Sequence, residues 1–241
     1  MKIAVIIPCY NEEECVTDVF NEISSIKIPN CYIEPVFIND CSKDNTLALL
    51  KSFNAKVLDL SVNLGIGGAV QAGFKYALLY DFDVAIQLDG DGQHPADQLI
   101  NLIAPIMANE ADVVIGSRFL EKEGFQSTFA RRLGINYFKF LNKFLVKKTI
   151  TDNTSGFRAI NNKALKEVCS YYPDEYPEPE AIILFALNNL RIKEIPVVMR
   201  ERIGGQSSIS SFKSIYYMVK VSLAIIFIYL RLKLNGKRST L

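Results

Sequence analysis

Two carboxylates that lie one residue apart give the strongest chemical signal in this sequence. Asp89 and Asp91 flank Gly90, directly after the apolar run Val84–Leu88. Carboxylates at a strand end can converge on one hard cation, and Mg²⁺ or Mn²⁺ bound in this way neutralises a diphosphate leaving group. Gln93 follows closely enough to support that cation. By itself the pattern is weak, because an Asp-Gly turn that only ends a strand has the same sequence.

Further candidate residues follow two other short apolar runs, at residues 3–7 and 33–38. They are Pro8, Tyr10 and Glu12 after the first run, and Asp40 after the second. A carboxylate at Asp40 could accept hydrogen bonds from the base or ribose of a nucleotide. The competing interpretation is a helix N-cap, for which Ser42 or Asp44 is better placed.

The elements that position these residues are predicted by the hydrophobic pattern. Strands are expected at Ile3–Ile7, Ile33–Ile38, Lys56–Leu60, Val84–Leu88 and Asp112–Ile115, and helices at Glu12–Ser25, Asp44–Phe53, Gly68–Leu79 and Ala96–Asn109. The second half is less regular, with a helix expected at Ala130–Lys148 and a last strand at Leu190–Met199. This alternation predicts an α/β fold with a mostly parallel central sheet flanked by helices. Because ligands bind beyond the carboxyl ends of such strands, the candidate residues should meet at one edge.

The bulk composition bounds the class of protein. The 241 residues suffice for one large α/β domain, and 49% hydrophobic with 22% charged residues exclude wholesale disorder. The five cysteines form an odd set without paired C-x-x-C spacing. Neither a zinc site nor a disulfide framework follows from them, and a reducing compartment is the simpler interpretation. The net charge of +1 identifies no partner by itself, and no nucleic acid partner is expected.

A glycine-rich segment at residues 63–68 raises the question of an oxidoreductase. Gly65 and Gly67 fit the dinucleotide-binding pattern G-x-G-x-x-G, but Val70 stands at the position of the third glycine. The segment also follows the third predicted strand, so an oxidoreductase is disfavoured. A sugar nucleotidyltransferase is disfavoured too, because no glycine-rich, lysine-bearing loop follows the first strand.

Six motifs, in chain order, resemble those of inverting family 2 glycosyltransferases with the GT-A fold. They are Pro8-Cys9-Tyr10-Asn11-Glu12, the Asp40 segment, Asp89-Gly90-Asp91-Gly92-Gln93-His94-Pro95, Gly116-Ser117-Arg118, Thr154-Ser155-Gly156-Phe157-Arg158 and Arg202-Ile203-Gly204-Gly205-Gln206-Ser207-Ser208. The last three are similar to motifs of the branch that contains dolichyl-phosphate mannose synthases and bacterial polyprenyl-phosphate glycosyltransferases. The resemblance covers roughly residues 3 to 210.

The resemblance implies a role for each matched residue. Those implied to bind the donor, a UDP or GDP sugar, are Pro8, Tyr10, Glu12, Asp40, Asp89 and Gly90, and those implied to bind Mg²⁺ or Mn²⁺ are Asp89, Asp91 and Gln93. Those implied to bind phosphate groups of donor or acceptor are Arg118, Arg131, Arg158, Arg202, Ser207 and Ser208. Asp91, Arg118 and Arg202 would thereby stabilise the charge that departs during transfer. A solvated surface arginine is the competing interpretation for Arg118 and Arg131, and a surface ion pair for Arg202.

The acceptor remains open between two chemistries. A polyprenyl phosphate or other lipid-linked phosphate is already anionic, whereas a sugar hydroxyl on a growing cell-surface polysaccharide must lose a proton to a base. Glu178 and Glu180 are the candidate catalytic bases, although acidic residues just before a helix are equally typical of macrodipole stabilisation. An inactive nucleotide-binding or scaffolding protein is the alternative of another class. The acidic pair together with two matched arginines argues against it.

The C-terminal segment is expected to associate with a membrane. Ser214–Lys233 is apolar apart from one internal lysine and a closing arginine, so it is shorter than the ~20 clean residues of a span yet too apolar for a typical surface helix. We therefore expect a catalytic domain over residues 1–211 and an interfacial helix with a basic tail over 212–241. This places the protein at the cytoplasmic face of a membrane, either peripherally or through a single anchor. A basic stripe at Arg132–Lys147 could add contacts with anionic headgroups. The competing interpretation is a helix in a homo-oligomer interface.

Overall fold

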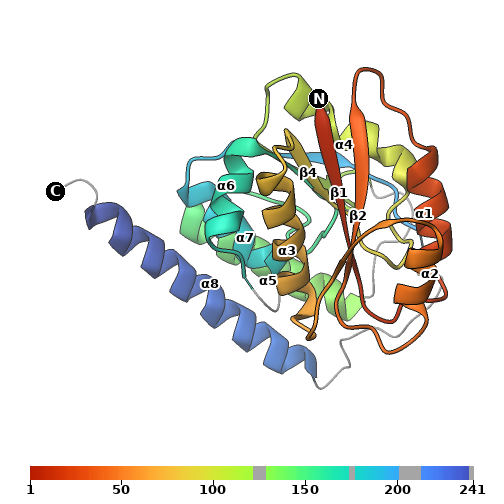
Figure 1. Ribbon diagram of the computed structural model, residues 1–241. Coiled ribbons are helices and arrows are strands. Elements are labelled where there is room, and N and C mark those ends of the chain that lie inside the picture. Colours follow the sequence, from red (N-terminus) through yellow and green to blue (C-terminus); the bar gives the residue numbers. More distant parts are fainter. Residues whose placement is uncertain (122–128, 174–176, 201–212, 239–241) are drawn as a thin grey trace.

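The computed structural model describes residues 1–121, 129–173, 177–200 and 213–238 (Figure 1). Within these residues the strands form one sheet in the order β3-β2-β1-β4-β6-β5-β7. The strands are β1 Lys2–Cys9, β2 Tyr32–Asn39, β3 Lys56–Asp59, β4 Val84–Gln87, β5 Val113–Ser117, β6 Arg158–Asn161 and β7 Ile192–Pro196. The strands predicted in the first half are confirmed with small shifts at their ends. The last strand is confirmed as a shorter element inside the predicted run.

Helices connect the strands and cover both faces of the sheet. They are α1 Val16–Ser25, α2 Thr46–Ser52, α3 Gly65–Leu79, α4 Leu99–Met107 after the short 3-10 helix η1 Ala96–Gln98, α5 Phe129–Val146, α6 Asn162–Ser170, α7 Pro177–Leu187 and α8 Lys213–Arg238. The predicted helices are confirmed, but α1 begins four residues later than the predicted Glu12. The residues before it form a loop that belongs to the candidate site.

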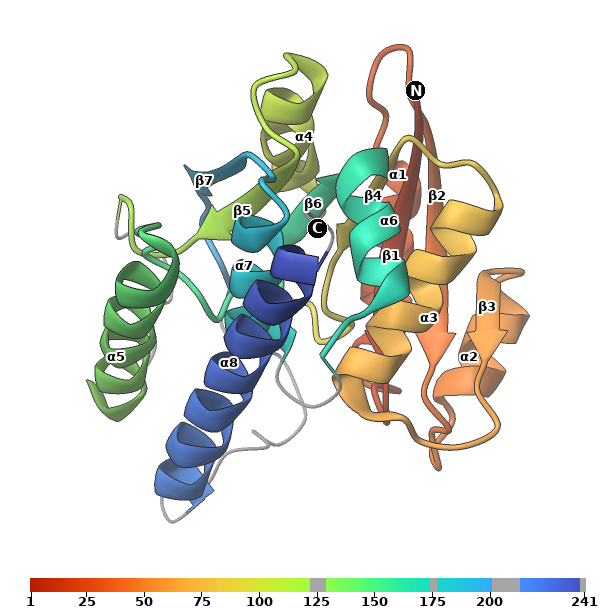
Figure 2. The same ribbon diagram turned by 90° about the vertical axis from the view of Figure 1, so that its left-hand side faces the viewer.

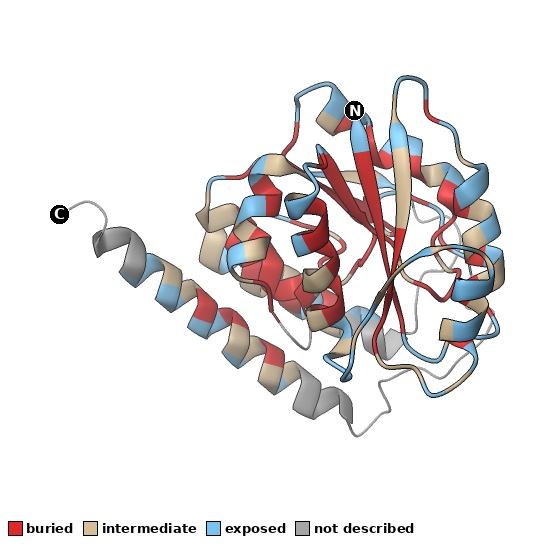
Figure 3. Cartoon of the chain, viewed as in Figure 1, coloured by how far each residue is buried: buried red, intermediate tan, exposed pale blue. Residues whose placement is uncertain are grey.

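Successive residues of the central strands enter two separate hydrophobic cores. In β1, Ile3, Val5 and Ile7 pack into the core that includes α1 and α4, whereas Ala4 and Ile6 pack into the core that includes α3 and α7. Both faces of the strand are therefore buried, as Figure 3 shows for the middle of the sheet. Burial on two faces explains why the strand has a continuous apolar run instead of an alternating pattern.

Strand β6 was not predicted from the sequence, and it changes the second half of the sheet. It lies between β4 and β5 and pairs antiparallel with both, whereas β1, β2, β3 and β4 are parallel to their neighbours in the first half. The four residues of β6 begin with a buried arginine and end with an asparagine that caps α6. So short a segment with polar ends has no hydrophobic run that could identify it. The sheet is mostly, but not wholly, parallel.

The expected C-terminal helix is present as α8, but it is not the apolar helix that was predicted. The helix is continuous, but Lys220 and Arg231 break its apolar sequence. No helix in the described part of the chain is long and apolar enough to cross a membrane. One face of α8 contributes Val221, Ile225 and Ile228 to the core beside α7. Figure 2 shows α5 and α8 side by side, away from α1 and α2.

Candidate functional site

The predicted acidic pair lies in the turn after β4, pressed against the end of β1. A methyl group on Gly90 would lie 2.8 Å from the Pro8 carbonyl oxygen and 2.9 Å from Cys9 Sγ. Only glycine therefore fits between the two carboxylates. Because β1 and β4 are neighbouring parallel strands, this close approach joins the first and third motifs at the carboxyl edge of the sheet.

Local hydrogen bonds fix the loop that carries the acidic pair. The backbone N–H of Gln93 donates to Asp91 Oδ1 (3.1 Å), and the backbone N–H of Asp89 donates to His94 Nδ1 (3.1 Å). The His94 ring stacks on Phe157, with 4.9 Å between ring centroids. Burial lowers the pKa of His94 to about 4 even though the Asp91 charge opposes the shift. The ring is therefore neutral at pH 7 and supports the loop as an acceptor.

The acidic pair suits a divalent cation that arrives together with a diphosphate. Among the described residues, no group of three or more His, Cys, Asp or Glu side chains is arranged to hold a metal alone. A magnesium or manganese ion bound with a nucleotide needs only one or two protein carboxylates, since phosphate oxygens and water supply the other ligands. Asp89 exposes 34% of its side chain, whereas Asp91 is buried. The side chain of Gln93 donates to the Arg200 carbonyl oxygen (3.4 Å), so its part in metal binding stays a prediction.

The loops after β1 and β2 are fastened to each other by hydrogen bonds. Backbone N–H groups donate across the two loops from Asn11 to Ser42 Oγ (3.1 Å), from Glu12 to Thr46 Oγ1 (2.9 Å), from Glu13 to Asp44 Oδ2 (3.1 Å) and from Lys43 to Asn11 Oδ1 (2.8 Å). The predicted donor residues Pro8, Tyr10 and Glu12 are thereby brought to one edge, with Tyr10 exposed. Their contacts with a nucleoside stay a prediction.

Asp40 is buried and joins β2 to the start of α3. Its two carboxylate oxygens accept the backbone N–H groups of Leu64 (2.7 Å) and Gly65 (2.9 Å). Asp40 therefore binds the start of α3 and does not cap the helix that follows it in sequence, which was the competing interpretation. Asp44 instead accepts the backbone N–H of Thr46 at the start of α2 (3.0 Å). A contact between Asp40 and a base or ribose stays a prediction.

Arg118 follows β5 and is buried in a forked ion pair. Its Nε and Nη2 atoms each lie 2.7 Å from an oxygen of Asp152, and Nη2 also donates to Thr154 Oγ1 (3.0 Å). Burial by itself lowers the pKa of Arg118, but the Asp152 bonds and the charges of Asp152, Asp89 and Glu178 outweigh it and raise that pKa. The surface arginine of the competing interpretation is thus wrong for this residue. Its contact with a phosphate stays a prediction.

Arg158 begins β6 and ties the loop before it to the start of α7. Its Nε donates to the Ser155 carbonyl oxygen (2.8 Å), and its Nη2 donates to the carbonyl oxygens of Asn153 (3.3 Å) and Glu178 (2.8 Å). The remaining nitrogen, Nη1, is buried and has no hydrogen-bond partner within the described part of the chain. The predicted contact of Arg158 with a phosphate stays a prediction.

Both candidate bases lie in the first turn of α7, and Glu178 contacts the last residue of β4. Gln87, the last residue of β4, donates from Nε2 to Glu178 Oε1 (3.4 Å), and its Oε1 accepts the Tyr172 hydroxyl (3.3 Å). Burial raises the pKa of the Glu178 carboxyl; the Arg158 charge opposes this and the Asp89 charge adds to it. Glu180 is buried on the same helix. Whether either one acts as a base stays a prediction.

Gly156 is the point at which the two halves of the site meet. A methyl group at this residue would lie 3.0 Å from Asp89 Oδ1 and 3.0 Å from Gln87 Nε2. The loop before β6 therefore approaches the acidic turn as closely as a glycine allows. The acidic pair, Gln87 with its partner Glu178, and the loop that holds Arg158 form one polar cluster.

Some site residues were missed and others lie outside the described structure. Gln87 and Asp152 were not singled out, although a glutamine inside the apolar run Val84–Leu88 is a sequence signal that could have been noticed. Arg202, Ser207 and Ser208 are outside the described residues, as is the side chain of Arg131, whose backbone belongs to α5.

Comparisons with known proteins identify the family of this chain. The family model described as glycosyl transferase family 2 matches residues 4–169. The chain is 31% identical to the UDP-N-acetylglucosamine–dolichyl-phosphate N-acetylglucosaminyltransferase of Methanococcus voltae, over 81% of this chain and 84% of that protein. It is 30% identical to the polyprenol monophosphomannose synthase of Mycolicibacterium smegmatis, over 90% of this chain and 84% of that protein.

Two solved structures have a similar fold at low sequence identity. Glucosyl-3-phosphoglycerate synthase from Mycobacterium tuberculosis, in complex with Mn²⁺, UDP and glucosyl-3-phosphoglycerate, is 18% identical with a TM-score of 0.67 and covers 96% of this chain and 79% of its own. TarS of S. aureus, residues 1–349 with UDP-GlcNAc, is 22% identical with a TM-score of 0.64. That match covers 94% of this chain and 66% of the TarS chain. These likenesses establish the α/β fold.

Proposed function

This chain belongs to glycosyl transferase family 2, and from that premise we propose that it transfers a sugar, with inversion, from a nucleoside diphosphate to a polyprenyl phosphate. The donor class is supported by the similar solved structures, which contain UDP or UDP-GlcNAc. The acceptor class is supported by the relatives from Methanococcus voltae and Mycolicibacterium smegmatis, whose names specify dolichyl phosphate and polyprenol. A UDP sugar is the first donor to test, and a GDP sugar the second.

The observation that carries the proposal is the meeting of an acidic pair and buried arginines at the end of the central strand. Asp89 and Asp91 would hold Mg²⁺ or Mn²⁺, and the bound ion would supply positive charge to the leaving diphosphate. Arg118 lies close enough to Asp89 for the carboxylate to raise its pKa. Arg158 adds a second buried guanidinium beyond Gly156. Positive groups fixed in a buried site stabilise developing negative charge without a reorganisation cost.

A phosphate acceptor is consistent with this site because the reaction needs no base. An oxygen of the polyprenyl phosphate forms a bond to the anomeric carbon, and the bond between that carbon and the nucleoside diphosphate breaks. The nucleophile is already anionic, so no proton has to leave. The guanidinium groups at the edge would orient both anionic reactants.

Transfer to a sugar hydroxyl is the second candidate function, and Glu178 favours it. The raised pKa of this buried carboxyl and its bond from Gln87 are typical of a general base held beside reacting groups. A hydroxyl acceptor would give its proton to Glu178 as the new glycosidic bond forms. The inactive scaffolding alternative finds no support in the geometry, since the acidic pair is intact and positioned.

We further propose that α5 and α8 place the enzyme on the cytoplasmic face of an anionic membrane. Neither helix contains an aspartate or glutamate. On α5, Phe140 and Phe144 are 68% and 73% exposed, and on α8 the exposed apolar residues are Val219, Leu223, Ile226, Phe227, Leu230 and Leu234. Two neighbouring helices with exposed apolar faces and only basic charges suit an interfacial contact with acidic headgroups. A homo-oligomer interface is the competing occupant of the same face.

A radiochemical transfer assay tests the reaction itself. Purified protein is incubated with Mn²⁺, polyprenyl phosphate and each of a panel of labelled UDP and GDP sugars, and lipid-soluble label is counted. We expect one donor to label the lipid, and only when a divalent cation is present. Failure of every donor in the panel, with the protein folded, would reject the proposed function.

The variant Glu178→Gln decides between the two acceptors. With polyprenyl phosphate, turnover should change by less than about 3-fold, because no proton is removed. With a sugar hydroxyl acceptor, loss of a general base should lower turnover by about 10²-fold or more. A large loss on the phosphate acceptor would contradict the base-free reaction.

A vesicle flotation experiment tests the membrane contact. The double variant Phe140→Ser/Phe144→Ser should float less with anionic vesicles than the wild type does. Leu79→Ser is the matched control, because Leu79 is 74% exposed but lies at the end of α3. Equal flotation of the α5 double variant and the Leu79→Ser control would contradict the membrane contact. Dimers in gel filtration that the α5 double variant disrupts would assign the face to an oligomer instead.

A further inference from the structure

Two carboxylates, those of Glu194 and Asp152, link β7 to Arg118. Glu194, in the middle of β7, accepts the backbone N–H of Thr151 (2.8 Å to Oε2), the hydroxyl of Thr151 (2.6 Å) and the backbone N–H of Asp152 (2.9 Å). One side chain thus fixes the peptide that carries Asp152. The Thr151 hydroxyl also lies 3.0 Å from Ser117 Oγ at the end of β5, which joins this turn to the strand before Arg118.

Asp152 in turn fixes the Arg118 side chain from two directions. It accepts Nε and Nη2 of the guanidinium (2.7 Å each), and its Oδ2 also accepts the backbone N–H of Arg118 (3.1 Å). Both residues are buried. Two parallel bonds set the plane of a guanidinium as well as its position, which a single contact cannot do.

The orientation of Arg118 matters because other carboxylates lie nearby. Asp89 and Glu178 are near enough to raise the pKa of its guanidinium. The fork to Asp152 fixes the plane in which the guanidinium lies beside these carboxylates.

We propose that Asp152 and Glu194 are positioning residues of the transferase site, acting through Arg118 without touching either substrate. The inference rests on the proposed function, since it assigns to Arg118 a part in stabilising the charge of the departing diphosphate. Asp152 sets the plane of the guanidinium, and Glu194 holds the peptide of Asp152. Their loss should therefore lower turnover more than it lowers the affinity for the donor.

The test compares three single variants in the same transfer assay. Asp152→Asn and Glu194→Gln should each lower kcat by roughly 10- to 100-fold, the scale expected when a reacting group is misplaced by about 1 Å. KM for the nucleotide sugar should change by less than about 3-fold. Asp112→Asn is the matched control, because Asp112 forms a similar forked pair with Arg191 before β5. It should lower the melting temperature and leave kcat unchanged.

A double-mutant cycle provides a measurement that a merely structural role would not move. Arg118→Lys removes the fork, so if Asp152 acts through Arg118, adding Asp152→Asn to Arg118→Lys should lower kcat little further. Combined with Asp112→Asn, Arg118→Lys should instead show its full effect. Additive losses for Asp152→Asn and Arg118→Lys would overturn the proposal.

The activity of the wild type and the variant Glu194→Gln distinguish failure of the proposed function from failure of the positioning roles. A wild type that transfers no sugar rejects the proposed function, whereas an active wild type with an unchanged kcat in both Asp152→Asn and Glu194→Gln rejects only the positioning roles. If Asp152→Asn does not fold, Glu194→Gln decides, because its own side chain does not contact Arg118. The binding of UDP with Mn²⁺, measured by calorimetry, should stay within about 3-fold in every folded variant.

Discussion

The two ends of strand β5 carry nearly the same ion pair in two different settings. Asp112, just before the strand, accepts Nε and Nη2 of Arg191 at 3.1 and 3.0 Å. Arg118, just after the strand, donates the same two atoms to Asp152 at 2.7 Å each. Both pairs are forked, and both join segments that are distant in sequence. Their surroundings differ, and with them their expected roles.

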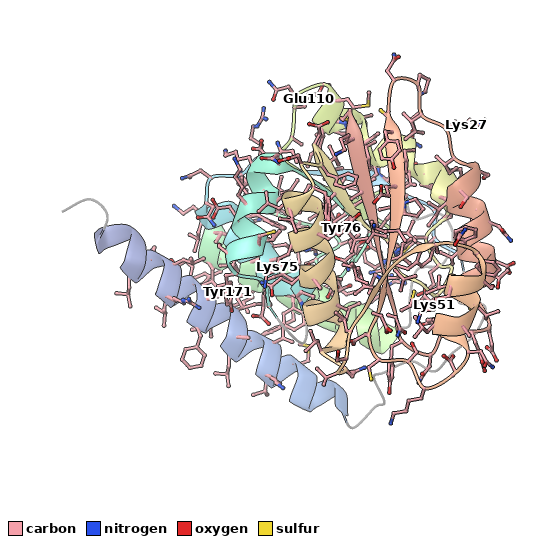
Figure 4. All side chains as sticks on the ribbon, in the orientation of Figure 1. Lys27, Lys51, Lys75, Tyr76, Glu110 and Tyr171 are labelled. Carbon is pink, nitrogen blue, oxygen red and sulfur yellow. The ribbon has the colours of Figure 1, made fainter. Side chains whose placement is uncertain are left out.

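Arg191 exposes 48% of its side chain and Arg118 only 8%. The pair of the buried Asp112 with the half-exposed Arg191 closes the end of the sheet that also holds the chain's N-terminus, where Glu110 lies in Figure 4. There Arg191 also donates to the carbonyl oxygen of Asn109. The buried pair faces the acidic turn at the opposite edge. A forked pair by itself therefore indicates a contribution to stability, whereas a buried arginine beside further carboxylates indicates a site.

The largest effect should come from the acidic turn at the site edge. Asp91→Asn keeps an oxygen that can accept the Gln93 N–H but loses the charge that a cation needs, so transfer should fall by on the order of 10²- to 10³-fold. The melting temperature without ligand should barely change. Turnover is measured across a Mn²⁺ titration. Normal turnover at saturating Mn²⁺ would show that Asp91 is not needed to bind the metal. The edge with the acidic turn would then differ less from the edge with the Asp112–Arg191 pair.

A smaller loss of activity is expected from Gly156→Ala. The added methyl group would press on Asp89 Oδ1 and Gln87 Nε2, so the acidic turn must shift and kcat should fall by roughly 10- to 100-fold. Gly134→Ala is the matched control. Gly134 lies on α5, and the methyl group added there would meet the flexible side chain of Met218 on α8. Equal activity in both variants would show that the close approach at Gly156 is not needed for transfer.

The far end of β5 should affect stability and not activity. Bonds from Arg191, together with Asn161, hold the pKa of Asp112 well below its usual range despite burial. This stabilisation is present above the unfolded pKa of about 3.9 and is lost as the pH falls through the folded value. Asp112→Asn should therefore cost about 1 to 3 kcal/mol at pH 7, and less as the pH drops below about 4. Urea unfolding at pH 7 and below about pH 4 measures the difference in unfolding free energy between the wild type and Asp112→Asn. A difference that is larger in acid would contradict a stabilising role of the Asp112 charge.

The smallest effect should come from Lys193→Ala, at the same end of the sheet. Lys193 pairs with Glu110 on the surface, where water and salt screen the attraction. We expect neither turnover nor the melting temperature to change measurably. A clear loss of stability would mean that this surface ion pair contributes more to folding than its solvent exposure indicates.

The first half of the site was predictable because its residues follow strands that the sequence identifies. Asp89 and Asp91 come directly after an apolar run, and parallel strands present their carboxyl ends together. Asp40 shows the limit of that reasoning. Its place at the edge was predicted, but its bonds to Leu64 and Gly65 depend on a helix start 24 residues later in the chain. The sequence pattern holds no sign of so distant a partner.

The second half could not be predicted because its partners come from segments without a hydrophobic period. Strand β6 has four residues with polar ends, so its antiparallel place between β4 and β5 was missed. The fork between Arg118 and Asp152 was missed for a related reason. The two residues are 34 positions apart, and only the pairing of β5 with β6 and β7 brings their loops together.

By itself, the sequence determined the α/β class, the run of strands in the first half and the carboxylates at their ends. Each of these depends on neighbouring residues, whose apolar pattern and turn chemistry act over a few positions. The tertiary structure alone decided which charges meet. It buried Arg118 against Asp152, placed Glu178 beside Gln87 and brought Gly156 against Asp89. Electrostatic effects depend on distance in space and on burial, and neither quantity is written in the order of the residues.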